Sequence, residues 1–462
     1  MSGAPGRYDV AIVGAGVVGS AIARELSQFE LRLALLEAGN DVGAATSKAN
    51  TALLHTGFDA QPGTLEAQLV RRGHELLSAY APRAGIPLER VGALLVAWTE
   101  QEQASFPAIV ERAHANGYER MRELTAAELY ARVPHLGPGA RAALEVPDEG
   151  IVCTFTTPLA FATEAVLAGC ELRLGARVSA VERSPGGGFE LTTTGGPVRT
   201  RFLVNAAGLF SDELDRMLGH DTFTVTPRRG ELIVFDKLAG PLLEHILLAV
   251  PTATTKGVLL APTVYGNLLL GPTAEQGDDR GDTSSTAAGL ARLRAEGRRL
   301  MPALEQHEVS AVYAGLRAAT EHSDYQIAIH APEGYACVGG IRSTGLSASM
   351  AIAEHVREQL AGAGLVLEPA DERPDFRMPN IGEHLPRPYQ QEQLIAQDPD
   401  FGRVVCFCER VTRGELLRAL QAPIPPVDIE GMRRRTRACM GRCQGFFCAA
   451  ELEALVGERA AP

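Results

Sequence analysis

No stretch of the 462 residues is apolar for long enough to span a membrane. Basic residues are also fewer than acidic ones, 44 against 56, so the net charge is −12 and a nucleic-acid partner is disfavoured. The first predicted strand begins within a few residues of the N-terminus and leaves no room for a secretory signal. We therefore expect a cytoplasmic protein, and peripheral attachment to a membrane stays open.

The composition is that of a soluble globular protein, with 45% hydrophobic and 22% charged residues. The length is too great for one ordinary core and suggests two or three domains. The acidic balance does not forbid an anionic substrate, because a few local arginines decide the charge of a pocket.

A glycine motif, Gly14-x-Gly16-x-x-Gly19, follows the apolar strand pattern Val10–Val13 and leads into a helical pattern. The first glycine allows a tight turn, the second lets the backbone approach a pyrophosphate, and the third lets helix and strand pack closely. The helix N-terminus then offers free N–H groups to phosphates. This context predicts a dinucleotide site.

An acidic residue stands where such a site needs one. A second strand pattern at 31–36 ends in Glu37, 18 positions after Gly19, where a carboxylate accepts hydrogen bonds from a ribose. The alternative is an ordinary βαβ unit with a charged strand end.

The cysteines divide unevenly between the body of the chain and its tail. Cys153, Cys170 and Cys337 are scattered and are expected to be plain buried residues. In a cytosolic protein, a cluster of cysteines in the C-terminal tail indicates a metal site rather than disulfides. The tail holds Cys406, Cys408, Cys439, Cys443 and Cys448.

The remaining patterns predict an α/β part and an inserted sheet. Strand patterns that fit the first domain lie at 171–174, 176–183, 201–208 and 335–341, and helical patterns at 64–81, 99–133, 347–360 and 412–420. A strand at 92–98 and alternating segments at 231–235, 249–252, 257–261 and 267–270 predict a largely antiparallel sheet. Residues 363–400 are rich in proline and charge, which is typical of a linker.

Several motifs together resemble one family. Tyr8–Gly19, Glu37, 46–48, 205–208 and 339–346 are similar to motifs of the FAD-dependent D-amino-acid oxidase/glycerol-3-phosphate dehydrogenase superfamily. The resemblance covers residues 7–360. Segments 48–55, 62–65, 265–267 and 271–273 look closest to bacterial anaerobic glycerol-3-phosphate dehydrogenase-like proteins, and they are also similar to L-2-hydroxyglutarate dehydrogenases.

The resemblance implies that the dinucleotide is FAD. Thr46 and Ser47 would lie near the pyrophosphate and flavin, and Val178 would lie near the adenine. The alternative for these three residues is that they only pack in a loop or in the core. The 340–347 turn would present backbone N–H groups to the flavin or pyrophosphate. The implied FAD-binding residues are Gly14, Gly16, Val17, Val18, Gly19, Glu37, Thr46, Ser47, Val178, Ala207, Gly208, Gly340, Ile341, Thr344, Gly345, Leu346 and Ser347.

The tail, 406–412 with 435–448, resembles the bacterioferritin-associated ferredoxin-like [2Fe–2S] domain of anaerobic members. Four thiolates suffice for such a cluster, and the implied ligands are Cys406, Cys408, Cys443 and Cys448. Cys439 stands where the family has glycine and could displace one ligand. A zinc site stays open, although the spacing fits zinc ribbons poorly. The basic run 433–437 is expected to be a solvated face or a docking surface.

The expected fold class is α/β. A Rossmann-like FAD-binding domain is built from about 1–85, 150–220 and 325–362, a mixed-sheet substrate domain is inserted at 86–149 and 221–324, and the linker at 363–400 leads to an iron–sulfur module at 401–458.

Oxidation of an alcohol requires a base for the hydroxyl proton and a grip on the anionic end of the substrate. His55 is the candidate base, because imidazole titrates near neutral pH, and its alternative is a core histidine. A guanidinium offers a planar fork to phosphate or carboxylate. Arg317, at the position of a family substrate-binding arginine, is the first candidate clamp, Arg342 the second and Arg229 the third.

We therefore expect a FAD-dependent dehydrogenase of a small anionic 2-hydroxy compound, glycerol-3-phosphate first. Hydride would pass to flavin, and electrons would leave through the cluster to an acceptor subunit or quinone. The alternatives are an L-2-hydroxyglutarate or other 2-hydroxy acid dehydrogenase, an amine or opine dehydrogenase, and a non-catalytic electron-transfer subunit.

Overall fold

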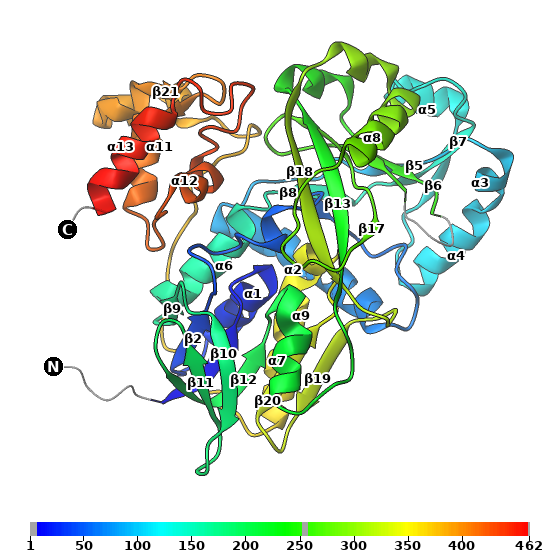
Figure 1. The fold of residues 1–462 in the computed structure, drawn as a ribbon. Helices are drawn as coiled ribbons and strands as arrows, with labels where there is room; N and C mark the ends of the chain where they lie inside the picture. Colours follow the sequence, from blue (N-terminus) through cyan, green and yellow to red (C-terminus); the bar gives the residue numbers. More distant parts are fainter. Residues whose placement is uncertain (1–6, 252–256, 461–462) are drawn as a thin grey trace.

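The computed structural model describes residues 7–251 and 257–460. Figure 1 shows a lower domain coloured blue, green and yellow, an upper sheet domain, and a separate orange-to-red module that contains the C-terminal helices. Among the described residues, no helix is both long and apolar enough to cross a membrane.

The lower domain is built on an eight-stranded sheet within the described chain, ordered β10-β11-β12-β1-β2-β9, with β20 beside β12 and β19 beside β20. The pairs β9–β2, β2–β1, β1–β12 and β12–β20 are parallel. Its strands are β1 (Tyr8–Val13), β2 (Leu33–Leu36), β9 (Glu171–Arg173), β10 (Val178–Arg183), β11 (Phe189–Thr193), β12 (Val198–Asn205), β19 (Gln326–His330) and β20 (Tyr335–Gly339).

Helices cover this sheet as the apolar strand patterns require, since a parallel sheet buries both faces. Helix α1 packs against both α6 and α9, and all four residues of β2 are buried. The helices of this domain are α1 (Val17–Leu26), α2 (Leu65–Ala84), α6 (Thr156–Leu167), α7 (Ser211–Met217) and α9 (Gly345–Gly362), with the short turns η1 (Thr46–Lys48) and η2 (Gly208–Phe210).

A small three-stranded sheet joins the two domains. It consists of β3 (Leu53–Leu54), β8 (Gly150–Val152) and β4 (Leu88–Glu89). Strands β3 and β8 run antiparallel, with Leu54 opposite Gly150. The residues just beyond this pair are His55 on one strand and Glu149 on the other, so the register brings them together.

In the part of the chain that the structure describes, the upper domain contains a nine-stranded mixed sheet that takes strands from both 86–149 and 221–324. Among the described residues, β14 and β5 pair in parallel, and the other strand pairs of this sheet are antiparallel. Its strands are β5 (Ala93–Ala97), β6 (Arg122–Thr125), β7 (Ala142–Val146), β13 (Thr226–Phe235), β14 (Ile246–Ala249), β15 (Leu259–Pro262), β16 (Leu268–Gly271), β17 (Glu275–Gln276) and β18 (Val309–Ala319).

Two predicted segments of this domain were wrong. The helical pattern 99–133 is broken into α3 (Glu100–Ala104), α4 (Phe106–Ala115), strand β6 and α5 (Ala126–Arg132), because Gly117 with a φ of +74° ends the helix and the chain then pairs with β7. The strand predicted at 249–252 lies at β14 instead, since Pro251 has no N–H to donate; residue 252 lies outside the described residues. The domain also contains α8 (Ala287–Leu300), η3 (Lys237–Leu242) and η4 (Pro302–Gln306).

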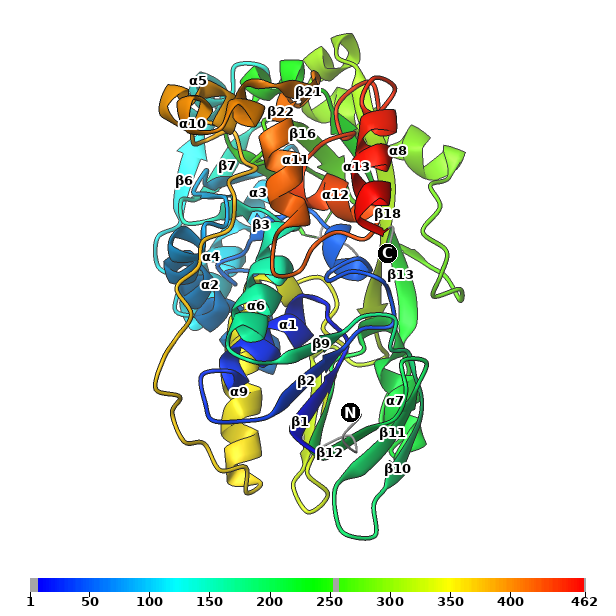
Figure 2. The same ribbon diagram turned by 90° about the vertical axis from the view of Figure 1, so that its left-hand side faces the viewer.

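After α9, the chain runs along the outside of the molecule to the C-terminal module, as the gold segment in Figure 2 shows. Residues 363–400 contain η5 (Pro388–Gln390), α10 (Glu392–Gln397) and the start of η6 (Pro399–Gly402). The module has a core of its own, which includes Val411, Leu416, Met432 and Leu452. Its elements are β21 (Val404–Cys406), β22 (Val411–Thr412), α11 (Arg413–Leu420), α12 (Ile429–Thr436) and α13 (Ala449–Ala460).

Candidate active site

The glycine turn between β1 and α1 has the shape that a pyrophosphate requires. A Cβ on Gly14 would lie 2.4 Å from the Ala206 carbonyl oxygen, and one on Gly19 would lie 1.9 Å from the Gly14 oxygen. Only glycine fits at either position. The N-cap residue Gly16 has no side chain that could cap α1, so backbone N–H groups at this end are available to an anion, apart from the Val17 N–H, which donates to Ser47 Oγ.

The loop after β2 is tied to this turn at both of its ends. Glu37 accepts hydrogen bonds from the N–H groups of Ala15 (2.9 Å) and Gly39 (2.8 Å). Ser47 Oγ accepts from the Val17 N–H at 2.9 Å. The carboxylate predicted for the ribose and the hydroxyl predicted for the pyrophosphate therefore border one turn, and these residues fit FAD.

The second predicted turn, 340–347, lies at the start of α9. Gly340 and Arg342 have positive φ angles of +63° and +52°. Thr344 Oγ1 donates to Glu66 at 2.7 Å, and Arg342 forms an ion pair with the same carboxylate. The structure therefore places Arg342 on an internal acid, which offsets its charge.

His55 lies between this turn and a buried acid. Its backbone N–H donates to Ser347 Oγ at 2.8 Å, and Nδ1 lies 3.1 Å from Glu149 Oε2. Glu149 is 0% exposed and also accepts hydrogen bonds from the N–H (2.8 Å) and hydroxyl (2.9 Å) of Thr56. A carboxylate at Nδ1 fixes the imidazole and directs Nε2 to the other side, as an orienting acid does for a catalytic base.

Two arginines share one face of the upper sheet. Arg317 on β18 is the register partner of Arg228 on β13, so both side chains lie on the same face. Tyr313 and Gly315 lie on that face too, because they are four and two residues before Arg317. A Cβ on Gly315 would lie 2.0 Å from the Ala49 oxygen, and Tyr313 donates to the Asn50 carbonyl at 2.9 Å. The face therefore points at the loop 46–50 of the lower domain.

Arg317 has the electrostatics of an anion site. Within residues 7–251 and 257–460, no acidic side chain pairs with it or with Arg228; its guanidinium reaches the Thr273 carbonyl at 3.3 and 3.4 Å. Burial, and then the charge of Arg228, lower the pKa of Arg317 to about 10. It stays a cation at neutral pH, and an anion would relieve the repulsion between the two guanidiniums.

Arg229 lies on the opposite face of β13 and is already neutralised. It pairs with Asp282 at 2.8 Å and with Glu275 at 3.2 Å. The sequence does not distinguish Arg228 from Arg229, because the difference depends on the register between β13 and β18. Glu149 and Arg228 are candidate site residues that sequence reasoning missed.

The other residues predicted to bind FAD lie in both expected turns and at the sheet edge. Thr46 Oγ1 donates to the Leu316 carbonyl at 3.0 Å, and the Ala207 N–H donates to Asn205 at 3.2 Å. Val178 begins β10, and Gly208 begins η2 with a φ of +58°. Leu346 belongs to the main hydrophobic core, and Ile341 and Val18 pack against that core. Their roles toward FAD stay predictions.

The tail cysteines gather within the module. Cys439 Sγ lies 3.4 Å from Cys448 Sγ, Cys406 lies close enough to Cys448 for the two thiols to influence each other's pKa, and the same is true of Cys408 and Cys443. Burial alone would raise the pKa of Cys443, but the N–H groups of residues 445–447 and Cys408 lower it. Such donors suit a thiolate that binds iron.

The thiols do not define a metal site by themselves. Over the described part of the chain, no group of three or more His, Cys, Asp or Glu side chains is arranged to hold a metal ion. Cys439 has a φ of +62°, in the left-handed region that favours glycine, which agrees with the glycine expected there. The cluster and its ligands stay predictions.

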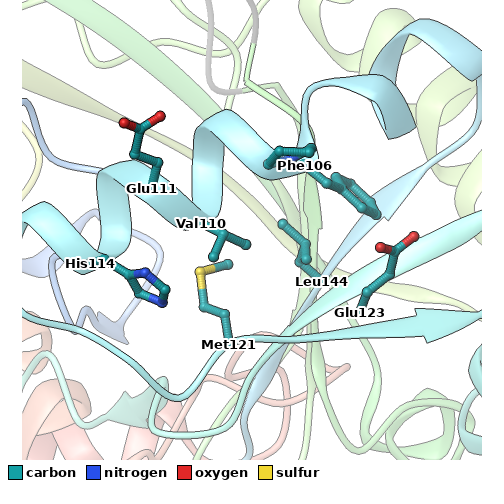
Figure 3. A pocket seen from close by; sticks show the side chains of 8 residues that line it. Phe106, Val110, Glu111, His114, Met121, Glu123 and Leu144 are labelled. Atoms are coloured by element: carbon teal, nitrogen blue, oxygen red, sulfur yellow. The ribbon is translucent and has the colours of Figure 1, made fainter.

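A surface hollow of about 510 Å³ lies away from this chemistry, between α4, β6 and β7. Figure 3 shows Val110, Met121 and Leu144 directed toward one another and Glu111 directed away. None of the predicted site residues lines this hollow.

Comparisons with known proteins agree with the fold. The model of the family described as "FAD dependent oxidoreductase" matches residues 9–359. The glycerol 3-phosphate dehydrogenase of Caloramator mitchellensis is 34% identical over 96% of this chain and 92% of its own length. The FAD-bound structure of L-α-glycerophosphate oxidase from Mycoplasma pneumoniae superposes with a TM-score of 0.76, at 27% identity, over 81% of this chain and all of that one.

A third relative has another substrate in its name. The L-2-hydroxyglutarate dehydrogenase of Salmonella houtenae is 32% identical over 58% of this chain and 64% of its own length. The family match covers more than half of the chain, so this protein belongs to the FAD dependent oxidoreductase family. It is a flavoprotein oxidoreductase whose relatives include glycerol 3-phosphate dehydrogenases and oxidases.

Proposed function

We propose that this protein is a FAD-dependent dehydrogenase that oxidises glycerol-3-phosphate. The observation that carries the proposal is the pair of cations on the sheet face that points at the FAD loop: Arg317 and Arg228 lie side by side with no acidic partner among the described residues. Both arginines are partly buried, and a partly buried charge without a partner is costly, so such a pair indicates a bound anion. A phosphate carries up to two negative charges and suits two guanidiniums.

The protein supplies the proton acceptor and the grip. His55 Nε2 takes the hydroxyl proton of the substrate, while Glu149 holds Nδ1 and stabilises the charge that the ring gains. Arg317 holds the phosphate and so fixes the distance of the carbinol from the base. FAD, when bound, supplies the acceptor for the hydride.

Electron exit through the C-terminal module is the second part of the proposal. The dehydrogenase relative aligns over 96% of this chain, an extent that must include most of the module, whereas 81% of this chain accounts for the whole oxidase structure. An outlet for single electrons is of no use when oxygen is the acceptor. We propose a [2Fe–2S] centre held by Cys406, Cys408, Cys443 and Cys448, with an acceptor subunit or a quinone as the partner.

The test is anaerobic titration of the purified flavoprotein with glycerol-3-phosphate, followed by the loss of flavin absorbance. Bleaching at sub-millimolar substrate supports the proposal. Bleaching by L-2-hydroxyglutarate alone would support the second candidate, which the Salmonella relative favours. Bleaching by an N-substituted amino acid alone would indicate an amine or opine dehydrogenase, and no bleaching by any of them would indicate a non-catalytic subunit.

A further inference from the structure

We propose that the C-terminal module is part of the FAD site: Arg434 and Arg435 of helix α12 hold Asp41 and thereby fix the loop between Glu37 and Ser47. The proposal rests on FAD binding and is independent of the substrate. It assigns a role in cofactor retention to an ion-pair cluster between two parts of the chain that are almost 400 residues apart.

The cluster is buried and geometrically specific. Asp41 is 2% exposed. Its Oδ1 lies 2.7 Å from Arg435 Nη2, and its Oδ2 lies 2.9 Å from Arg435 Nη1, which is the two-pronged arrangement of a guanidinium on a carboxylate. Arg434 Nη2 lies 2.6 Å from the same Oδ2. Removing one partner of such a buried pair leaves an uncompensated charge.

The loop that this cluster holds is the one that borders the glycine turn. Glu37 lies four residues before Asp41 and bonds to Ala15, while Ser47 lies six residues after it and bonds to Val17. Between them, Gly43 donates to the Ala15 carbonyl at 2.9 Å. Asp41 therefore lies near the middle of a segment whose two ends carry the predicted ribose and pyrophosphate contacts.

Two further features support a built interface. Asn40 donates to Asp428, the N-cap residue of α12, at 2.6 Å. Helix α12 also comes close to Asp41 at Gly431, where a Cβ would lie only 3.3 Å from Asp41 Oδ2. Figure 1 and Figure 2 both show α12 above α1, so the module lies over the loop edge of the FAD domain.

The charge balance of the cluster also suits the cofactor. Two guanidiniums share one carboxylate, so one positive charge is left over beside the loop that binds the pyrophosphate. Burial alone would raise the pKa of Asp41, but Arg435 and Arg434 outweigh burial and lower it, so the carboxylate stays ionised at neutral pH.

Because both events use one loop, docking of the module and binding of FAD must be coupled. Thermodynamic linkage makes this coupling reciprocal: the docked module raises FAD affinity, and bound FAD strengthens docking by the same factor. A coupling of 1–3 kcal/mol is typical and corresponds to a change of about 5- to 150-fold in affinity.

The experiment measures FAD affinity of the full-length apoprotein by quenching of flavin fluorescence. We compare the wild type with Arg435→Lys, which keeps the charge and removes the fork, and with Asp41→Asn. The matched control is Arg442→Gln, which removes a contact between the module and Asp236 of the substrate domain, at 2.8 Å, without touching the loop. A second readout is the rate of protease cleavage within 363–400, with and without FAD.

The proposal predicts FAD dissociation constants raised about 5- to 150-fold by Arg435→Lys and Asp41→Asn and unchanged by Arg442→Gln. It also predicts that FAD slows linker cleavage in the wild type and not in Asp41→Asn. Equal FAD affinity in all four proteins would overturn it, as would an equal loss in the control. If Asp41→Asn fails to fold, the FAD dissociation constant of Arg435→Lys alone tests the proposal. Failure of glycerol-3-phosphate to bleach the flavin would leave both readouts intact.

Discussion

The Oε2 atom of Glu149 lies 3.1 Å from Nδ1 of His55 because the strands that precede and follow these residues pair in register. The contact makes Glu149 an orienting residue for the base. Replacing His55 with Asn should lower the anaerobic rate of flavin reduction by about 10²- to 10⁴-fold, the usual contribution of a general base. Stopped-flow absorbance measures this rate, and unchanged flavin content is the control.

Replacing Glu149 with Gln should have a smaller effect that depends on pH. The amide still accepts from Nδ1–H but no longer stabilises a charged imidazole, so we expect about a 10- to 100-fold slower reduction. The acid limb of the kcat/KM profile should move to lower pH, because the imidazolium loses its counter-charge. A loss of rate without movement of this limb would show that Glu149 only supports the fold.

Arg317 should govern affinity for the anionic end of the substrate. Removing a charge-assisted pair of hydrogen bonds by Arg317→Gln costs about 2–5 kcal/mol, which is about 30- to 5,000-fold in kcat/KM. Arg229→Gln is the matched control, since Arg229 lies on the other face and already has two acidic partners. Steady-state assays with an artificial acceptor should find that the control stays within about threefold of the wild type.

Arg228 should contribute specifically to a doubly charged anion. Arg228→Gln should weaken the binding of glycerol-3-phosphate, and the loss should be greater above the second phosphate pKa, near 6, than below it. The comparison is KM at pH 5.5 and at pH 7.5. An equal change at both pH values would mean that Arg228 does not contact the phosphate.

Asp41 should stabilise the fold in a pH-dependent way. Its pKa is held below the ordinary 3.8 in the folded protein, so its stabilising contribution is present above that value and is lost as the pH falls through the folded pKa. The difference in denaturation midpoint between the wild type and Asp41→Asn should therefore be constant from pH 6 to 8. It should shrink only below about pH 4.

The iron–sulfur proposal predicts that the iron can be removed by mutation without loss of the flavin. Cys408→Ser with Cys443→Ser should remove the iron, about two atoms per chain, while the flavin stays. The Cys439→Gly variant should keep its iron, and glycine should remove the backbone strain that a positive φ imposes on cysteine at that position. Iron analysis and electron paramagnetic resonance of the reduced protein measure both results. Iron retained in the double variant would contradict the ligand assignment.

The sequence predicted the parts of the site that depend on local geometry. The Gly14–Gly19 turn and Glu37 were predicted from their spacing along the chain, whereas Ser47 and Ser347 were implied by the family resemblance. Each of them lies in a turn beside a helix or strand end, where local geometry has few alternatives, and their roles toward FAD stay predictions.

The parts that the sequence could not provide depend on pairing between distant strands. Glu149 meets His55 through the β3–β8 pair, and Arg228 joins Arg317 through the β13–β18 register. A shift of one residue in that register would have put Arg229 on the site face instead. The docking of Arg434 and Arg435 on Asp41 is less predictable still, since nothing local relates 41 to 434.

The most direct test of the account is the anaerobic titration of the wild type and Arg317→Gln with glycerol-3-phosphate. The account predicts full bleaching of the wild-type flavin at sub-millimolar substrate, and bleaching of Arg317→Gln only at concentrations higher by about 30-fold or more. Equal bleaching of both proteins would contradict the assigned anion site. A wild-type flavin that stays oxidised with this substrate would contradict the proposed function.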